Sequence, residues 1–215
     1  MDIDPASLST RDRYKILIGV IVPRPIAFVS TISPDGRPNI APFSFFNGVG
    51  SDPMTVLFCP ANNSDGTDKD TLRNCDHPPT GVGQFVVNVA TEHYAARMAA
   101  TSEPLPYGQS EFDLAGLTPT PSRLVKPPRL AESPVALECE TFEIVRTNPG
   151  AAGGGNVVIG RVIWIHAQDG LIDDRLRVDP DKLKAVGRMA GASYTTTRDR
   201  FDLPFGRAAL EAAPD

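Results

Sequence analysis

Lys69, Asp70 and Thr71 stand where the sequence predicts the start of a helix, with Thr67 or Asp68 as its capping residue. Free N–H groups at a helix N-terminus attract anions, and Lys69 and Thr71 would add a cation and a hydroxyl group. Together these groups can hold a phosphate. The alternative is an ordinary capped helix on the surface, with a solvated lysine.

A second stretch with chemical potential is the hairpin predicted between Pro23 and Phe46. Its first strand, Ile26–Ile32, is rich in β-branched and aromatic residues, and the turn at 34–36 has the sequence Pro-Asp-Gly. The return strand ends in the aromatic and small polar run of residues 41–47. Such a hairpin end could hold a flat ring with a phosphate tail, although most hairpins hold no ligand.

The remaining polar residues do not form a recognisable catalytic set. His77, His93 and His166 lie in unrelated contexts, and the chain has no Gly-x-Ser-x-Gly elbow for a hydrolase nucleophile. No compact set of His, Cys, Asp or Glu has the spacing of a metal site, so we expect no metal. We therefore name no catalytic side chain, and the chemistry that remains is the binding of a ligand.

Charge and cysteine content exclude several other classes of protein. The net charge is −5 and there is no block of Lys or Arg, which argues against binding to nucleic acid or to an anionic membrane. Cys59, Cys75 and Cys139 are an odd number at long spacings, as expected for a reducing compartment. Residues 1–10 do not resemble a signal peptide, and no apolar run approaches the ~20 residues of a membrane helix. We expect a soluble cytoplasmic protein.

The pattern of elements predicts a mainly β protein. At 215 residues the chain suits one domain. Short helices are expected after residue 68 and at Arg11–Gly19 and Thr91–Ala100, and strands at Met54–Phe58 and Gln84–Val89. We expect no regular structure in three stretches: a loop at 48–53, a long surface excursion at 103–117 and an extended segment at 118–129. Many strands with few helices favour an antiparallel barrel over alternating β-α-β units.

Two long strands are predicted to form an antiparallel pair at Val135–Arg146 and Asn156–Ala167. One slip in the alternation of the first strand suggests a β-bulge. Its core candidates are Val135, Leu137, Cys139, Phe142 and Ile144. The glycine-rich connection at 147–155 is interpreted as a flexible hairpin end, with a mobile lid as the alternative. It is not a dinucleotide fingerprint, because no strand-to-helix context surrounds it.

These segments and several others together resemble a known family. In the first half they are Pro23–Thr31, Gly36, Asn39, Ala41–Asn47, Lys69–Thr71, Phe85–Asn88, Ser110–Phe112 and Gly116–Thr118. In the second half they are Pro128-Arg129, Leu137–Cys139, Gly160–Val162, His166, Val178-Asp179, Arg188, Gly191 and Tyr194. Their order and spacing across residues 12–200 are similar to the flavin reductase-like, FMN-binding split-barrel family. The subgroup includes flavoredoxin and the reductase components of two-component monooxygenases.

The resemblance implies a fold and an assembly. The fold would be an antiparallel six-stranded Greek-key split β-barrel with a few flanking short helices, forming one domain over residues 1–215 with its core at about 12–200. The assembly would be a homodimer, with FMN in a cleft near the subunit interface.

The resemblance also implies the residues of the site. Val29, Ser30 and Thr31 would run beside the flavin ring and supply backbone groups to its polar edge. The ribityl-phosphate would meet Ser44 and its neighbours Phe43 and Phe45, and the phosphate cradle would be completed by Lys69, Asp70 and Thr71. Further candidates, from the same pocket or from the partner chain, are Asn47, His166, Arg188 and Tyr194. For His166 the alternative is a packed or exposed side chain without a ligand.

The implied activity is that of an NAD(P)H:flavin oxidoreductase that accepts hydride at the flavin and passes reduced flavin to a partner oxygenase or a small acceptor. The flavin supplies the redox chemistry, so no side chain is needed as acid or base. One alternative is an electron-transfer flavoprotein that does not use nicotinamide. Another is a split-barrel scaffold that binds FMN poorly. The sequence leaves NADH or NADPH, and FMN or FAD, open.

Overall fold

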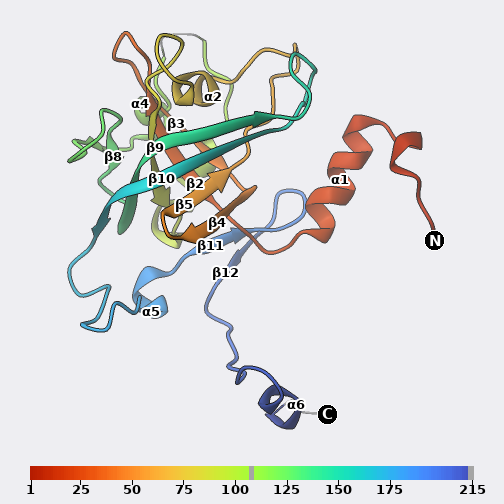
Figure 1. Cartoon of the computed structure of the whole chain (residues 1–215), viewed down its shortest axis with the longest axis vertical. Helices are drawn as coiled ribbons and strands as arrows, with labels where there is room; N and C mark the ends of the chain where they lie inside the picture. Colours follow the sequence, from red (N-terminus) through yellow and green to blue (C-terminus); the bar gives the residue numbers. More distant parts are fainter. Residues whose placement is uncertain (107–108, 213–215) are drawn as a thin grey trace.

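An antiparallel sheet of seven strands forms the body of the protein (Figure 1). The structure, a computed structural model, describes residues 1–106 and 109–212 of the 215-residue chain. The strands follow one another across the sheet in the order β3 (Pro38–Phe43), β2 (Ala27–Ile32), β6 (Gln84–Val89), β9 (Val135–Arg146), β10 (Asn156–Ala167), β5 (Met54–Phe58) and β4 (Phe46–Ser51).

Short strands and helices surround this sheet. A second sheet joins β1 (Arg24–Pro25), β11 (Val186–Arg188) and β12 (Tyr194–Thr196), and a third pairs β7 (Pro119–Thr120) with β8 (Arg129–Leu130). The α-helices are α1 (Thr10–Val20), α2 (Asp70–Cys75), α3 (Ala95–Ala100), α4 (Glu111–Ala115), α5 (Pro180–Leu183) and α6 (Ala208–Ala212). Two 3₁₀ turns lie at Pro5–Ser7 and Glu92–Tyr94. Within the described residues, no helix is both long and apolar enough to span a membrane.

Aromatic side chains from three strands make the centre of the main core. The ring of Phe58 lies 5.1 Å from that of Phe43 and 5.2 Å from that of Phe85. Gly160 on β10 faces Phe85, and a Cβ atom at that position would lie only 2.2 Å from the Phe85 ring. This glycine is therefore required by the packing of β10 over the aromatic core.

The predicted hairpins are confirmed. β2 pairs with β3 from Ala27 opposite Phe43 to Ile32 opposite Pro38, and β9 pairs with β10 along their whole length. The predicted bulge is present at Phe142, which has no partner between Thr141 and Glu143 in the register with β10. The bulge turns Phe142 outward, so our assignment of Phe142 to the core is wrong; its side chain is 57% exposed.

Several expected boundaries are also wrong. Residues 46–51, expected to be mostly loop, form β4, and this extra strand makes the sheet seven-stranded rather than six-stranded. The excursion at 103–117 contains α4, because Ser110 caps a new helix and Gly116 ends it in a left-handed conformation; residues 107–108 lie outside the described residues. Helix α1 continues past Gly19 and ends with Ile21 as its C-cap.

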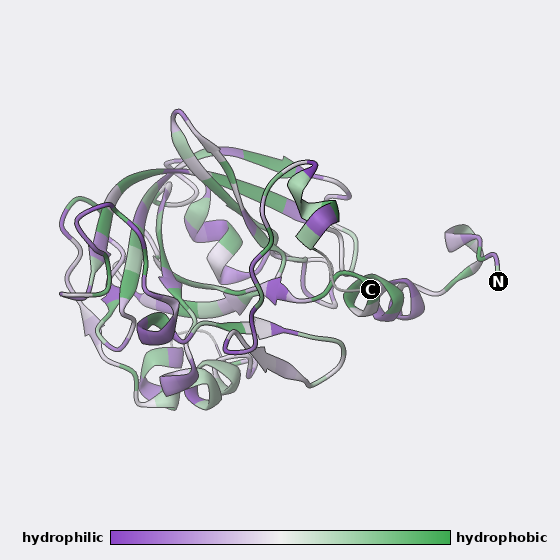
Figure 2. Ribbon diagram, turned by 90° about the horizontal axis from the view of Figure 1, so that it is seen from below, coloured by the Kyte–Doolittle hydropathy of each residue, from purple (hydrophilic) through white to green (hydrophobic). Residues whose placement is uncertain are grey.

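Both ends of the chain project from this body (Figures 1 and 2). Helix α1 has no buried side chain, although Tyr14 and Val20 are apolar and 56% and 71% exposed. The segment 197–212 carries Phe205 and Leu210, which are 100% and 81% exposed. We call α1 and residues 197–212 the terminal arms. Whether the body and the arms form one domain stays a prediction.

Candidate functional site

A groove of about 610 Å³ lies between β3, the start of α2 and the segment that precedes α4. One part of its lining is apolar and consists of Ala41, Pro42, Phe43, Pro104 and Leu105. Another part carries amide, hydroxyl and ammonium groups from Asn62, Asn63, Ser64, Lys69 and Thr71. A groove of this size with an apolar surface and a few convergent polar groups is typical of a small-molecule site.

Helix α2 is held against the sheet by side-chain hydrogen bonds. Asn39 on β3 donates to Thr71 Oγ1 at 2.9 Å and to Thr31 Oγ1 at 3.2 Å. Asn74 on α2 also donates to Thr31 Oγ1, at 3.0 Å. Thr31 therefore does not line the groove but supports it, since it holds the two asparagines that position α2 beside β3.

Lys69 occupies the cap position of α2, so the prediction that Thr67 or Asp68 caps this helix is wrong. No side chain caps the helix, because the Thr67 hydroxyl bonds to Asp65 instead. The Lys69 ammonium group is exposed and lies 3.4 Å from Asn63 Oδ1. Asp70 forms an ion pair with Arg73, at 2.5 Å. Lys69 is thus a cation at the groove whose hydrogen bond to its own chain is long.

Two acidic side chains of the groove lining, Glu111 and Asp65, accept hydrogen bonds from other groups of the chain. Glu111 accepts a hydrogen bond from the backbone N–H of Ile40, at 3.4 Å, and burial raises the pKa of its carboxyl above the ordinary value. Asp65 accepts from the hydroxyl and the N–H of Thr67, and these bonds hold its pKa below the ordinary value. Ionisation is therefore less favourable than usual for Glu111 and more favourable than usual for Asp65, whose negative charge stays in the groove lining.

The corner between β3 and β4 contains a second group of predicted residues. Arg24, only 3% exposed, donates to Ser44 Oγ at 3.2 Å and lies 5.8 Å from the centre of the Phe45 ring. It also donates to the carbonyl groups of Ile18, Ile21 and Met189. Burial lowers the pKa of Arg24 from its ordinary value. The Ser44 hydroxyl is thus part of a junction between α1, β11 and the corner.

The remaining candidates of this region lie on β4 and the small sheet. Asn47 is exposed on β4 and accepts a hydrogen bond from the N–H of Gly48. Arg188 and Tyr194 are paired across β11 and β12, and the guanidinium of Arg188 stacks 4.5 Å from the centre of the Tyr194 ring. These residues adjoin the Ser44 corner through Arg24, which pairs with Arg188 in the sheet register.

Val29 and Ser30 lie inside the sheet. Both are fully buried on β2, where their backbones pair with β3 on one side and with β6 on the other. The Ser30 hydroxyl donates to the carbonyl of Pro128. The ladder thus occupies backbone groups that we expected to face a flavin, and neither residue is among those that line the groove.

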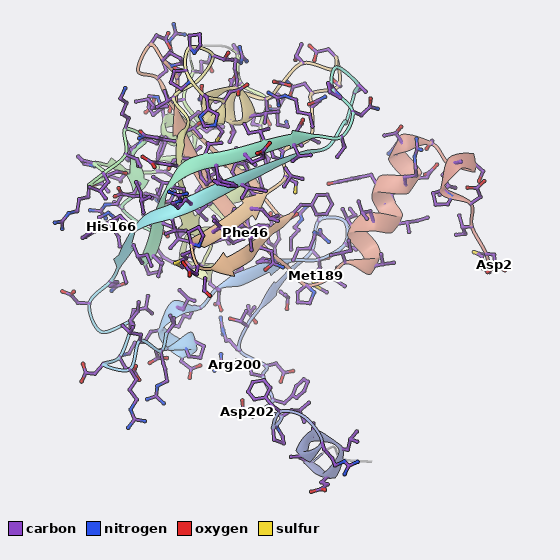
Figure 3. The ribbon with its side chains drawn as sticks, viewed as in Figure 1. Asp2, Phe46, His166, Met189, Arg200 and Asp202 are labelled. Atoms are coloured by element: carbon purple, nitrogen blue, oxygen red, sulfur yellow. The ribbon has the colours of Figure 1, made fainter. Side chains whose placement is uncertain are left out.

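His166 lies far along β10 from the groove. Its Nε2 is 2.5 Å from Oε1 of the buried Glu138. Asn156, which begins β10 near the groove, is ten residues away, roughly 30 Å along a strand. Figure 3 shows His166 near one end of β10. His166 and the groove of the same chain are therefore not brought together.

A second hollow, of about 430 Å³, adjoins the groove and shares Asn39, Asp70 and Glu111 with it. Its two cations, Arg37 and Arg73, are each paired with an aspartate. We place the candidate site in the groove rather than here, because the groove holds Phe43, Lys69, Asp70 and Thr71 together.

The sequence reasoning missed three contributors to the groove. Asn39 bridges β2 and α2, and the adjacent pair Asn62-Asn63 supplies amides next to Lys69. Glu111 and residues 101–105 reach the groove from the predicted surface excursion. The run of Asn-Asn-Ser directly after a strand was a usable signal, whereas nothing in the local sequence around Glu111 indicates its partner in β3.

Comparison with known proteins identifies the family. The profile described as "Flavin reductase like domain" matches residues 20–186, and the chain belongs to this family. An uncharacterised protein of Halalkalibacterium halodurans is 39% identical over 206 residues, which are 94% of this chain and 95% of that protein. Family membership implies a flavin-binding protein.

Solved structures agree with this assignment. Nitrilotriacetate monooxygenase component B of Bacillus cereus matches with a TM-score of 0.87 and 32% identity, over 94% of this chain and 98% of that one. The 2-nitrobenzoate 2-nitroreductase of Pseudomonas fluorescens matches with a TM-score of 0.83 and 31% identity, over 96% and 97%. A flavin reductase-type protein of Shewanella frigidimarina with a split-barrel domain, 19% identical over 96% and 100%, has a TM-score of 0.80. The fold is therefore that of the split barrel.

Proposed function

We propose that this protein binds FMN in the groove and acts as an NAD(P)H:flavin oxidoreductase. The observation that carries the proposal is the division of the groove lining. Ala41, Pro42 and Phe43 offer an apolar surface along β3, and Lys69 offers an ammonium group at the start of α2. A flavin mononucleotide has the same division, with a flat ring at one end and a phosphate at the other.

The donors in the groove fit the phosphate of this cofactor. A phosphate requires cations and hydroxyl or N–H donors, and Lys69, Thr71 and Ser64 can supply an ammonium group and two hydroxyl groups. Asp70 does not oppose this, because Arg73 neutralises its carboxylate. Asn39 and Thr31 would keep α2 at a constant distance from β3, so that the phosphate and the ring are held at once.

When bound, the flavin supplies the hydride chemistry, and the protein supplies binding, orientation and electrostatics. Phe43 is 8% exposed and packed on Phe58, so it would give the ring a rigid apolar support. Pro42 and Ala41 would continue this support and exclude water from it. No acid or base is assigned.

A homodimer is the second part of the proposal. The exposed apolar side chains of α1 include Leu17 and Val20, and an isolated helix of 11 residues is marginal in water. A second copy that covers α1 would remove this apolar surface from water. His166, which lies far from the groove of its own chain, is assigned in this proposal to the groove of the partner chain.

The electron acceptor is proposed to be a flavin-dependent monooxygenase or a small molecule. The supporting observation is the likeness to a protein whose name describes it as a component of a monooxygenase. We place the protein in the cytoplasm, because Cys59, Cys75 and Cys139 are all free thiols.

An anaerobic titration tests the proposed activity. Purified protein is loaded with FMN, its absorbance near ~450 nm is recorded, and NADH or NADPH is added. We expect bleaching by at least one nicotinamide. If FMN binds but neither nicotinamide reduces it, the protein is an electron carrier of the flavoredoxin type. If neither FMN nor FAD binds, the scaffold alternative replaces the proposal.

A further inference from the structure

Two loops distant in the sequence are packed together behind the groove. The first is the wall loop, residues 60–68, which joins β5 to α2 and contributes Asn62, Asn63, Ser64 and Asp65 to the groove lining. The second is the glycine loop, residues 147–155, which joins β9 to β10. The two loops pair at an isolated antiparallel bridge between Ala61 and Gly155.

Buried asparagines fasten the wall loop to the glycine loop. The backbone N–H of Asn62 donates to the carbonyl of Gly154 at 2.9 Å, and its side-chain amide donates to the carbonyl of Ala151 at 3.0 Å. Asn156 donates to Asn62 Oδ1 at 2.8 Å and to the carbonyl of Pro60 at 3.0 Å. Both asparagines are at most 5% exposed, so these bonds are shielded from water.

The two backbones approach too closely for a side chain between them. A Cβ atom on Gly66 would lie 2.2 Å from the carbonyl oxygen of Gly150, and Gly66 also has a φ of +84°. Arg146, at the end of β9, also contacts Asp68 of the wall loop at 3.4 Å and Asp76 at 3.0 Å. The glycine loop is therefore a fitted support and not a free lid.

The inner face of the wall loop transmits this support to Lys69. Asn63 is held by a backbone hydrogen bond to Thr67 and by a side-chain bond to the Thr67 hydroxyl. The Oδ1 atom of the same Asn63 accepts from Lys69 Nζ. A shift of the wall loop would therefore move Asn63 and, through this hydrogen bond, Lys69, which is the cation of the proposed phosphate site.

We propose that the glycine loop positions the phosphate-binding end of the groove, with Gly66, Asn62 and Asn156 as positioning residues. The inference rests on the proposed flavin site and adds that affinity for the phosphate depends on a segment outside the groove. The ring end of the groove, formed by β3, is independent of the glycine loop.

A matched pair of glycine variants tests this inference. Gly66→Ala and Gly36→Ala both place alanine at a left-handed φ, +84° and +86°, and so share the backbone strain. Only Gly66→Ala adds a clash, because Gly36 has nothing within 4 Å of the added Cβ. Dissociation constants for FMN and for riboflavin, which lacks the phosphate, are measured by fluorescence titration.

We expect Gly66→Ala to weaken FMN binding about tenfold, the order of one lost charge-assisted contact, with riboflavin binding changed less than about twofold. Gly36→Ala should leave both values as in the wild type. If Gly66→Ala does not fold, Asn156→Asp replaces it, since aspartate keeps the shape but loses the donors to Pro60 and Asn62.

Equal FMN affinity in the wild type and in Gly66→Ala, or in Asn156→Asp where it is used, would overturn the inference and leave the proposed function intact. An equal loss of FMN and riboflavin binding would also overturn it, since that result describes general damage. If the wild type binds neither molecule, the proposed function falls, and the inference falls with it.

Discussion

Residues 121–128 and the terminal arms both lie outside the main sheet. Polar contacts with the body hold residues 121–128, whereas the arms leave apolar side chains exposed. Residues 121–128, which we call the strap, cross β9 and are bound by the buried carboxylate of Glu138. Glu138 accepts from the backbone N–H groups of Arg123 and Leu124, both at 2.7 Å, and contacts His166. The arms instead expose apolar side chains, such as Val20 and Phe205.

The strap therefore needs no second chain to satisfy its polar groups, whereas the arms leave apolar surface uncovered. In the strap and in the wall loop, polar groups of the same chain satisfy one another, so their conformation is determined within the monomer. In the arms, apolar area stays in water, which costs free energy unless another surface covers it. Arg24 connects the N-terminal arm to the body, because its guanidinium donates hydrogen bonds to the carbonyl groups of Ile18 and Ile21 at the C-terminal end of α1.

The largest effect is expected from Glu138→Gln. The amide NH₂ would face a backbone N–H of the strap, and a buried acceptor would be lost, so we expect the free energy of unfolding to fall by about 3 kcal/mol. Urea denaturation measures this loss. Glu140→Gln, on the same strand but exposed, is the control and should leave the midpoint almost unchanged. Equal midpoints for the two variants would mean that the strap is not anchored by Glu138.

Lys69→Ala tests whether the ammonium group in the groove binds the phosphate of FMN. Removal of the ammonium group should weaken FMN binding about tenfold, while riboflavin binding stays the same, because only FMN carries a phosphate. Fluorescence titration measures both ligands. Lys182→Ala, on the surface of α5, is the charge-matched control. A comparable loss of FMN binding in the control would show that the effect is general electrostatics and not a contact.

Leu17→Ser tests the arms. Leu17 is 44% exposed on α1, and burial of its remaining apolar surface by a second copy would stabilise a dimer. We expect the dimer dissociation constant to rise about tenfold, in line with the free energy of burying part of one leucine. Sedimentation velocity across a concentration series measures it, with Arg13→Ser in the same helix as control. A wild type that stays monomeric at all concentrations would contradict the proposed covering of α1.

The smallest effect is a pH dependence of stability that has opposite signs at Glu138, which is buried, and at Glu111, which is half-buried. Burial acts to raise the pKa of Glu138, but hydrogen bonds from the N–H groups of Arg123 and Leu124 and from His166 outweigh it and lower the pKa. Its stabilising contribution is therefore present above the ordinary pKa of 4.5 and is lost as the pH falls through the lowered value. Burial raises the pKa of Glu111, so ionisation of Glu111 costs stability as the pH rises past 4.5.

Urea midpoints between pH 3 and 7 separate these two signs. The difference in urea midpoint between the wild type and Glu138→Gln should become smaller as the pH falls below about 4.5. Over the same fall in pH, the urea midpoint of the wild type should instead rise relative to that of Glu111→Gln. The same sign for both variants would contradict the assignment of the two environments.

Local sequence patterns correctly predicted the elements that depend only on residues close together in the chain. The Pro-Asp-Gly turn and the alternation of residues 135–146 gave the two hairpins and the bulge, because side chains of period two and turn residues act within a few positions. The same patterns failed at Phe142 and at residues 46–51, where the partner strand decides which face is buried and whether an edge is paired.

Some of the predicted site residues come together at the groove, and others lie elsewhere. Lys69, Asp70 and Thr71 were chosen from local sequence, and the structure brings them together with Phe43 at one groove. Ser44, Arg188 and Tyr194 fall at a neighbouring corner, and His166 lies far away. Their roles stay predictions, because a second chain would be needed to bring some of them to the groove.

Patterns in the sequence predicted the mainly β class, the long hairpin, the family and the presence of a helix near residue 70, although not its capping residue. Each of these depends on neighbours a few residues apart or on the order of motifs along the chain. Only the tertiary structure decided that Asn39 holds α2, that Glu111 reaches β3, and that the glycine loop supports the wall loop. These contacts join residues separated by about 30 to 90 positions. Their geometry arises from the packing of whole strands and leaves no local trace in the sequence.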